Sequence, residues 1–266
     1  RSPEEIRIQL DVPVLALVGE MPVTDESGLT SIRMLSEPNS TDTEAFRTLR
    51  TALSFASRPT RQLVVTSTEP GDGKTTVLAN LGVAFAQSGK RTLVIDADMR
   101  RPGLTRKLNL KGPRGLSTIL QSDEPIAVAA AGNLSKTELN TFDVIPAGPR
   151  PTSPAELLHG GRFSELISWA ESAYDQILID APPTLAVSDP AIIGTMVDGV
   201  LLVVRPGTNR RRMVFRAVES ITAIDADLVG VVINNVDSDT VSDYHGYGYE
   251  YGSEDEAAES PHRLAA

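Results

Sequence analysis

The sequence predicts an α/β fold: a doubly wound, mostly parallel sheet with helices on both faces. Short runs of consecutive aliphatic residues, many of them β-branched, are typical of strands buried on both sides of a sheet. These runs alternate along the chain with longer stretches of helical spacing, which is the pattern of strand–helix–strand units. With 266 residues, of which 41% are hydrophobic, the chain can form one large domain or two small ones. Folds of this class bind ligands at the carboxyl ends of their strands.

The individual elements follow from these patterns in chain order. A short apolar run at 14–18 is a candidate edge strand, and Phe46, Leu49 and Leu53 then recur near helical spacing. The later predicted strands are Leu63–Thr66, Arg91–Ala97, Phe142–Ile145, Gln176–Asp180, Gly199–Val204 and Leu228–Ile233. The predicted helices are Thr43–Ala56, Thr75–Ser88, Ser153–Ser172, Ala186–Met196 and Asn209–Ala223. The stretch between about 98 and 141 is rich in loop-forming residues.

Changes in composition divide the chain into three parts. Residues 1–40 are mixed and rich in Pro, Ser and Glu toward their end, which indicates an arm or linker. Residues 41–236 carry the alternating pattern and form the predicted domain. Residues 237–266 are acidic, contain Gly, Ser and Tyr, and show almost no aliphatic periodicity, so we expect a flexible tail.

The composition excludes several classes of protein. The 25 Lys and Arg residues against 35 Asp and Glu residues give a formal net charge of -10, the opposite of a general nucleic-acid binder. The absence of cysteine excludes disulfides and thiolate ligands, and three scattered histidines argue against a metal site built from histidines. No run approaches the ~18–20 unbroken apolar residues of a membrane span, and no signal-peptide pattern opens the chain. We expect a cytosolic domain and, because the sequence begins at Arg1, a fragment of a longer chain.

The segment LVVTSTEPGDGKTTVLANL has the pattern of a phosphate-binding loop between a strand and a helix. Glycines allow the backbone N–H groups to point inward, Lys74 brings a positive charge to the β and γ phosphates, and the Thr75 hydroxyl can hold Mg²⁺. The amino end of the following helix adds positive potential. Thr68 stands where the strict pattern has its first glycine. The residues expected to bind the nucleotide are Gly71, Asp72, Gly73, Lys74, Thr75 and Thr76.

Aspartates follow two other aliphatic runs. Asp96 and Asp98 lie two residues apart in LVIDADMR, which would put them on the same side of an extended chain, and Asp180 ends ILIDAPP. A nucleotide triphosphate with Mg²⁺ needs hard oxygen ligands and a group that orients the attacking oxygen. Aspartates at strand carboxyl ends beside a phosphate loop meet that need.

These three segments together resemble the deviant Walker family of P-loop ATPases, with a Walker A loop, a second acidic motif and a Walker B strand. That family includes Min- and Par-type positioning ATPases and the bacterial tyrosine kinases of polysaccharide export. By this resemblance, the positioning ATPases carry a signature lysine five residues before the loop lysine. Glu69 occupies that position here, which counts against them.

Four of the five tyrosines, Tyr244, Tyr247, Tyr249 and Tyr251, lie within eight residues of the tail. Because aromatic residues are valuable in cores, such a cluster on a Gly-rich acidic segment suggests phosphoacceptors, although a sticky low-complexity segment is the simpler alternative. A phenol with pKa near ~10 needs a base near the attacked phosphorus, a role that suits Asp96 or Asp98. About ten extended residues span roughly 30 Å, so the tail can reach its own site or a neighbour's.

With these elements in place, the chain resembles the cytoplasmic kinase domain of a bacterial tyrosine kinase (BY-kinase), a polysaccharide co-polymerase with a P-loop NTPase-like fold. The resemblance covers about residues 10–252 and includes EAFRTLRTAL, RRPGLTRKL and DAPPTLAVSDP. It implies ATP as phosphoryl donor, Lys74, Asp96 and Asp98 as catalytic residues, and autophosphorylation of the tail tyrosines. It also implies that Mg²⁺ is held through Thr75, Asp96 and Asp180. Arg205 and Asn234 are weaker candidates for contacts with the base of the nucleotide.

The same resemblance implies partners and a location. The pattern of Glu44, Arg47 and Arg50 would mediate assembly of a homo-oligomeric ring, while a simple helix surface remains the alternative. Further implied partners are a membrane-spanning chain-length regulator, fused or separate, and a tyrosine phosphatase. The domain would lie at the inner face of the cell membrane and regulate exopolysaccharide or capsule synthesis. A Min/Par-type ATPase switch and a nucleotide-gated assembly adaptor remain competing functions.

Overall fold

A computed structural model describes residues 11–22 and 26–237, and within them the strands form one eight-stranded sheet in the order β1-β8-β7-β2-β6-β3-β5-β4. The strands are β1 Val14–Gly19, β2 Gln62–Ser67, β3 Thr92–Asp96, β4 Ser135–Lys136, β5 Phe142–Ile145, β6 Gln176–Asp180, β7 Gly199–Val204 and β8 Leu228–Val236. Neighbouring strands pair in parallel except β4 with β5, where the short edge strand runs antiparallel. The doubly wound, mostly parallel sheet is therefore as predicted.

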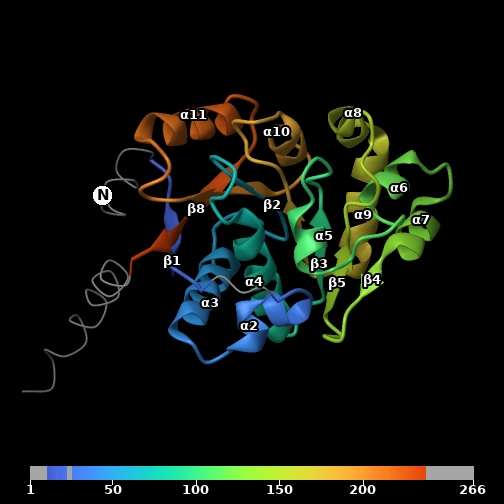
Figure 1. The fold of residues 1–266 in the computed structure, drawn as a ribbon. Helices are drawn as coiled ribbons and strands as arrows, with labels where there is room; N and C mark the ends of the chain where they lie inside the picture. The colour runs from blue at the N-terminus through green and yellow to red at the C-terminus, as the bar shows by residue number, and fades with distance from the viewer. Residues whose placement is uncertain (1–10, 23–25, 238–266) are drawn as a thin grey trace, which may run out of the picture.

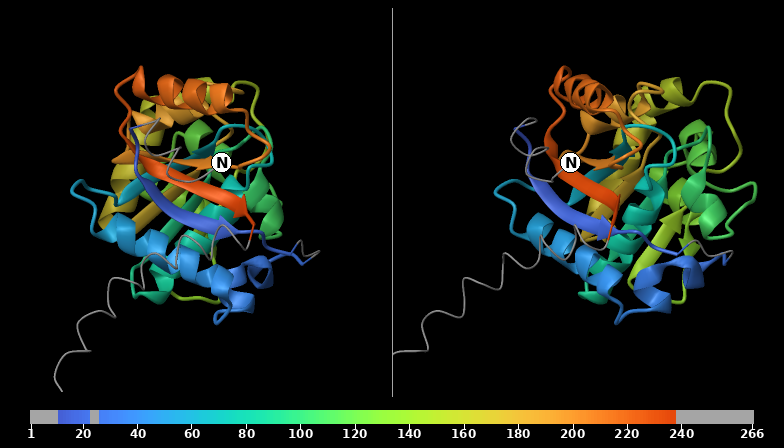
Figure 2. Two further views of the ribbon diagram at one scale, coloured as in Figure 1. Left: turned by 90° about the vertical axis from the view of Figure 1, so that its left-hand side faces the viewer. Right: turned by 60° about the vertical axis from the view of Figure 1, so that its left-hand side comes forward.

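Helices cover both faces of this sheet (Figures 1 and 2). One face is covered by α2 Arg33–Ser36, α3 Thr41–Ser54, α4 Lys74–Gln87 and α5 Gly103–Lys107. The other carries α6 Leu116–Gln121, α7 Ile126–Asn133, α8 Pro154–His159, α9 Gly161–Ala173, α10 Asp189–Gly194 and α11 Arg211–Thr222. A short 3-10 helix, η1, spans Leu29–Ser31.

The central strands supply side chains to both layers. In β6, Ile177 and Ile179 pack under the α6–α11 layer, whereas Leu178 between them packs against the α2–α5 layer. This alternation is the period-two geometry of a strand, and all three side chains are fully buried. Burial on both faces explains why these strands appear in the sequence as unbroken aliphatic runs.

The fold begins before residue 41, the predicted start of the domain. The candidate edge strand is present as β1, which pairs with β8. Downstream of it, the Met34 side chain is fully buried, and its backbone N–H donates to Asn80 Oδ1 at 2.9 Å. Much of the predicted arm therefore belongs to the folded domain: β1 forms one edge of the sheet beside β8, and Met34 packs against α4. The predicted tail, from residue 238 onward, lies outside the described residues, and the origin of the arm stays a prediction.

Two helical predictions differ from the structure. The single helix predicted over Ser153–Ser172 is two helices, because Gly160 adopts an extended conformation (φ -69°, ψ 152°) between α8 and α9. The loop-rich stretch after β3 contains the short helices α5 to α7, whose few turns give weak periodicity in sequence. None of the helices in the described ranges combines the length and apolar character that crossing a bilayer requires.

Candidate functional site

The strand order brings the predicted site segments together. β6 lies between β2 and β3, so the loop after β2 and the ends of β3 and β6 meet at one edge of the sheet. Asp180, at the end of β6, is paired in register with Asp96 on one side and with Val65 on the other. This is the carboxyl edge of the parallel strands, where such folds bind ligands.

The phosphate-loop sequence forms the predicted turn between β2 and α4. Gly73 has φ 94°, and a Cβ on it would lie 2.1 Å from Asn234 Nδ2, so both its conformation and its surroundings require glycine. α4 begins at the next residue, Lys74, and directs its amino end toward the site. The loop therefore places a positive helix end at the site, as an anion-binding loop does.

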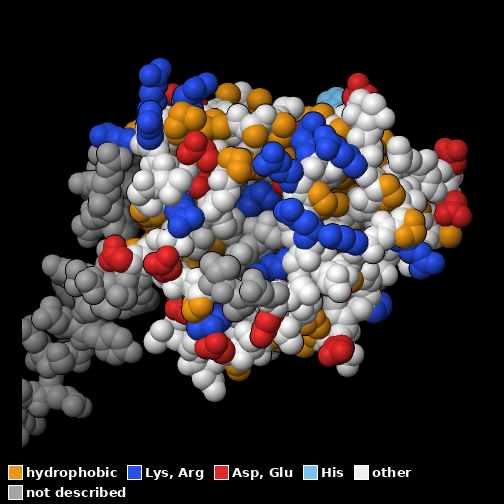
Figure 3. All heavy atoms as spheres, in the orientation of Figure 1, with side chains coloured by type: hydrophobic (Ala, Val, Ile, Leu, Met, Phe, Trp, Pro, Cys, Tyr) orange, Lys and Arg blue, Asp and Glu red, His pale blue; other side chains and the backbone are white. Residues whose placement is uncertain are grey.

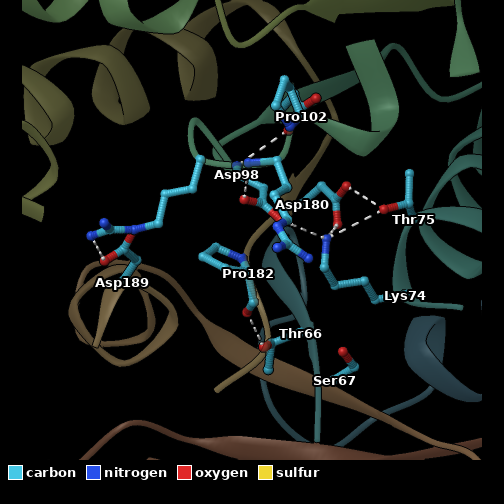
Figure 4. A network of polar contacts seen from close by, with 12 residues as sticks. Thr66, Ser67, Lys74, Thr75, Asp98, Pro102, Asp180, Pro182 and Asp189 are labelled. Carbon is cyan, nitrogen blue, oxygen red and sulfur yellow. Dashed lines mark hydrogen bonds and ion pairs between the residues drawn. The ribbon is translucent and has the colours of Figure 1, made fainter. Parts of the chain in front are cut away.

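Lys74 and Thr75 contact the aspartates of the neighbouring strands (Figure 4). Lys74 Nζ lies 3.0 Å from Asp180 Oδ1 and 3.3 Å from Asp98 Oδ2. The Thr75 hydroxyl donates to Asp180 Oδ2 at 2.7 Å. One ammonium group thus lies between the carboxylate at the end of β6 and that of Asp98, two residues after the end of β3, and a hydroxyl shares the first of them.

Burial and pairing oppose each other in this cluster. Burial alone would lower the pKa of Lys74, but the charges of Asp180 and Asp98 outweigh it and raise that pKa. Burial raises the pKa of Asp180, while Lys74 and the Thr75 hydroxyl counteract part of the increase. Lys74 therefore stays a cation, and its charge opposes part of the rise that burial causes in the pKa of Asp180.

A cavity of about 610 Å³ opens above this cluster. Of the residues predicted to act here, Gly71, Gly73, Lys74, Thr75, Thr76 and Asp98 line it. Arg100, Arg101 and Arg106 also line it. Basic side chains gather on this face of the molecule (Figure 3) in the area where α5 and α10 lie in Figure 1. The cavity is thus large enough for a small-molecule ligand and bordered by positive charge.

The side chain of Asp72, a residue predicted to bind the nucleotide, holds the loop together. This side chain is fully buried; Oδ2 accepts from Glu69 N at 2.7 Å, and Oδ1 accepts from Asn209 Nδ2 at 2.9 Å. Asn209 Nδ2 also lies 3.0 Å from Glu69 Oε2. Burial raises the pKa of Asp72, and these hydrogen bonds oppose the increase. The role of Asn209, at the end of the loop after β7, had no signal in the sequence beyond its place before a helix.

The two weaker candidates for base contacts also contact this loop. Asn234 Nδ2 donates to the carbonyl of Asp72 at 2.8 Å, and Arg205 Nη1 lies 3.5 Å from the carbonyl of Gly71. The other amide atom, Asn234 Oδ1, is buried and has no hydrogen-bond partner within the described part of the chain. A second cavity of about 590 Å³ is lined by residues 206–211, the segment that comes directly after Arg205 in the sequence.

Asp96 and Asp98 have different partners, contrary to the expectation that both face one side. Asp98 lines the cavity, whereas Asp96 is fully buried and absent from its walls. Both oxygens of Asp96 accept hydrogen bonds from residues that follow it in the chain, including two from Thr105 in α5. Burial raises the pKa of Asp96 to about 7, an effect that the charge of Asp180 reinforces and Thr105 opposes.

Asp189 is a further polar residue of the site that no motif in the sequence indicates. It is fully buried at the start of α10, and Arg100 contacts both of its oxygens, with Nε and Nη2 each at 3.2 Å. This ion pair links the loop after β3 to the segment after β6, the two walls of the cavity. Only the fold brings these two positions together.

The predicted assembly residues have partners within the chain. Glu44 accepts from Arg47 Nη1 at 3.0 Å, and the Glu44 side chain remains 64% exposed. Arg50 Nη1 donates to the carbonyl of Ala84 at 3.1 Å, at the carboxyl end of α4. Arg50 is thus engaged with its own chain, while Glu44 remains accessible. The four predicted phosphoacceptor tyrosines, Tyr244, Tyr247, Tyr249 and Tyr251, lie outside the described residues.

Replacing Gly103 with alanine is expected to weaken Mg²⁺-dependent nucleotide binding by roughly ten-fold, the equivalent of about 1.4 kcal/mol. A Cβ at Gly103 would lie 2.8 Å from Thr75 Oγ1, an atom already held by Asp180, so that hydroxyl would have to move. Calorimetric titration of ADP with and without Mg²⁺ measures the effect. Gly112→Ala is the matched control, because nothing lies within 4 Å of its Cβ position. Equal affinities for both variants would contradict the prediction.

The sequence matches the family described as CobQ/CobB/MinD/ParA nucleotide binding domain over residues 63–251. It is 37% identical over 223 residues to the tyrosine-protein kinase YwqD of Bacillus subtilis, covering 83% of this chain and 91% of that protein. It is 39% identical over 228 residues to the tyrosine-protein kinase wzc of Salmonella typhimurium, covering 84% of this chain but only 31% of that protein.

The structure is similar to the kinase domain of the Escherichia coli tyrosine kinase ETK. The TM-score is 0.79 with 26% sequence identity, and the superposition covers 100% of this chain and 99% of the ETK chain. These findings confirm the predicted resemblance and the fold class. They also show that the chain corresponds to nearly all of one relative and to less than a third of another.

Proposed function

The chain belongs to the bacterial tyrosine-protein kinases within the CobQ/CobB/MinD/ParA nucleotide-binding family, and on that premise we propose that it transfers the γ-phosphoryl group of ATP to tyrosine hydroxyls. The proposed acceptors include Tyr244, Tyr247, Tyr249 and Tyr251 of its own tail. The observation that carries the proposal is the convergence of Lys74, Thr75, Asp98 and Asp180 on one cavity edge. A phosphoryl-transfer site needs this combination: a cation for phosphate, hard oxygens for a metal, and a carboxylate facing the cavity.

The residues fit ATP and Mg²⁺. The Thr75 hydroxyl and an Asp180 oxygen lie 2.7 Å apart, the pair of hard oxygens that a Mg²⁺ ion in a nucleotide site uses beside phosphate and water. Within the described ranges no three carboxylates or imidazoles form a metal-binding group. When bound, Mg²⁺ would supply positive charge to the phosphate oxygens. Asn234 Oδ1, a buried acceptor without a partner among the described residues, suits the exocyclic amine of adenine.

Two residues of the chain would act on the reacting groups. Lys74 is placed to leave its two carboxylates for the phosphates once these bring negative charge to the cavity. Asp98 lines the cavity and is the better placed carboxylate to accept the phenol proton as the oxygen attacks phosphorus. Asp96, which does not line the cavity, would support Asp98 through the loop between them.

Assembly and cellular role belong to the same proposal. We propose that Glu44, Arg47 and Arg50 help form a homo-oligomeric ring in which one subunit's tail reaches the next subunit's site. The proposed surroundings are the inner face of the cell membrane, with a membrane-spanning chain-length regulator and a tyrosine phosphatase as partners. The proposed output is control of exopolysaccharide or capsule synthesis. Length differences among the relatives support a regulator that is fused in some and separate in others.

A positioning-ATPase function is less well supported by the site. Glu69, at the position of the signature lysine of those proteins, is engaged with Asn209 of its own chain, and a carboxylate cannot replace a lysine at phosphate.

Incubation of the purified 266-residue chain with ATP and Mg²⁺ tests the proposal. We expect phosphotyrosine, detected by intact mass and by peptide mapping to residues 244–251. Each phosphate also adds about -1.5 to -2 charges at neutral pH, which native gels resolve. Binding of ATP without any phosphotyrosine, even after mixing with a nucleotide-free second copy, would contradict a kinase and favour a nucleotide-gated scaffold.

A further inference from the structure

Thr105 makes three buried hydrogen bonds, two to the carboxylate of Asp96 and one to the backbone of Ala147. Its backbone N–H donates to Asp96 Oδ2 at 2.8 Å, and its hydroxyl donates to the same oxygen at 2.7 Å. The hydroxyl oxygen also accepts from the backbone N–H of Ala147 at 2.9 Å. Thr105 is 5% exposed and Asp96 is fully buried, so water does not compete for these groups.

The Ala147 contact fixes the direction of the Thr105 hydroxyl proton. A backbone N–H can only donate, so it occupies a lone pair of the hydroxyl oxygen. The hydroxyl proton is then directed to the carboxylate, the acceptor on its other side. Ala147 is itself held in place by Ser117, whose backbone N–H donates to the Ala147 carbonyl at 3.0 Å. The hydroxyl is therefore held between two groups that the fold fixes.

The Asp96 carboxylate also contacts the backbone of Asp98, the residue that lines the cavity. Its other oxygen, Oδ1, accepts from the backbone N–H of Asp98 at 3.2 Å. The Asp98 side chain then accepts from Arg101 N at 2.9 Å and contacts Lys74 Nζ at 3.3 Å. The chain of contacts runs from Thr105 through the Asp96 carboxylate to the backbone of Asp98, and every member is nine-tenths or more buried up to the cavity wall.

We propose that Thr105 is a positioning residue: its hydroxyl, aligned by Ala147, orients the Asp96 carboxylate, which in turn sets the place of Asp98 beside Lys74. This inference rests on the proposed function for the identity of the reaction. A carboxylate that must meet an incoming hydroxyl tolerates little displacement, so loss of the alignment acts on turnover more than on nucleotide binding.

Thr105→Val and Thr105→Ser separate the hydroxyl from the rest of the side chain. Valine keeps the shape of threonine and removes the hydroxyl, whereas serine keeps the hydroxyl and removes the methyl group. We expect Thr105→Val to lower kcat by roughly ten-fold or more with KM for ATP within about two-fold, and Thr105→Ser to restore most of kcat. The affinity for ADP and Mg²⁺, measured by calorimetry, should stay within about two-fold for both variants.

Three further measurements guard against a merely structural effect. Thr141→Val removes a hydroxyl that donates to the Ala86 carbonyl at the opposite edge of the sheet, so it should lose stability without losing kcat. In an Asp96→Asn background, Thr105→Val should have little further effect, because the two residues act as one unit. If Thr105→Val does not fold, Thr105→Cys serves instead, and its weak donor should give turnover below that of Thr105→Ser.

Wild-type turnover in Thr105→Val, failure of serine to restore it, or independent effects of Thr105→Val and Asp96→Asn would each overturn the inference. Absence of phosphotyrosine from the wild-type chain is a separate outcome, which contradicts the proposed function and not the role of Thr105. Loss of the ATP γ-phosphate to water then becomes the turnover that the same variants test.

Discussion

Lys74→Met is expected to abolish phosphotyrosine formation by the purified chain, with a loss of at least roughly 10³-fold in the rate of phosphoryl transfer. The ammonium group lines the cavity, where the proposed transfer would develop negative charge that a cation stabilises. Methionine has similar length but cannot stabilise that charge, and removal of one cation from a phosphoryl-transfer site typically costs this much. Quantification of phosphotyrosine against time measures the loss.

The same substitution should also change the pH dependence of stability. Without Lys74, Asp98 and Asp180 face each other with no cation between them, and loss of one partner of a buried ion pair costs about 3–5 kcal/mol. Burial already raises the pKa of Asp180, and removal of the lysine charge raises it further. An acid whose pKa is higher in the folded state destabilises the fold above that pKa and is relieved as the pH falls.

Denaturant unfolding at several pH values should therefore show the largest deficit for Lys74→Met at alkaline pH and a smaller one toward acidic pH. Lys111→Met, at an exposed position, is the matched control and should keep both activity and the wild-type pH profile. Transfer rates are compared at a pH where unfolding curves show both variants fully folded. Phosphotyrosine at close to the wild-type rate in folded Lys74→Met would refute the catalytic role of this lysine.

The parts of the site that the sequence predicts are those built from local signals. The glycines, Lys74 and Thr75 follow one another at a strand-to-helix junction, so their spacing alone indicates the loop. Asp180 is predictable because it ends a buried strand, and all parallel strands end at the same edge. The fold class is predictable for a related reason, since strands buried on both faces remain visible as aliphatic runs.

The contacts that orient these groups depend on loops that only the fold brings together. Period-two spacing put Asp96 and Asp98 on one side, but β3 ends at Asp96, so the alternation of a strand does not extend to Asp98. Thr105, Asn209 and Asp189 are ordinary polar residues in sequence, and each gains its role from a hydrogen-bond partner that the fold places beside it. Such roles need tertiary structure, because nothing in residue type or spacing distinguishes these positions.

Replacing Tyr244, Tyr247, Tyr249 and Tyr251 together with phenylalanine is expected to remove most of the phosphate that the chain incorporates. Phenylalanine lacks the attacking oxygen and keeps the ring, so the site itself should remain intact. Calorimetry should give an unchanged affinity for ADP and Mg²⁺. Undiminished label in this variant would show that the acceptors lie elsewhere.

Tyr174 provides the internal control for this experiment. It is 6% exposed, its hydroxyl donates to Asp143 Oδ2 at 2.8 Å, and burial raises its pKa. A buried phenol that is also a hydrogen-bond donor to a carboxylate is not available to a nucleotide site. Tyr174→Phe should therefore retain full label and lose only about 1 kcal/mol of stability from the missing hydrogen bond.

The two sets of variants together decide whether the reaction occurs between chains. On the proposed roles, the Lys74→Met chain keeps its four acceptors but does not transfer phosphate, and the tail-phenylalanine chain keeps its catalytic site but lacks the main acceptors. For transfer between neighbours, mixing the two should label Lys74→Met alone, at a rate that rises with total protein concentration. For transfer within one chain, the mixture should contain no more phosphotyrosine than either protein by itself. Reach alone permits both results, and we expect the first because the proposed ring would hold a neighbour's site close to each tail.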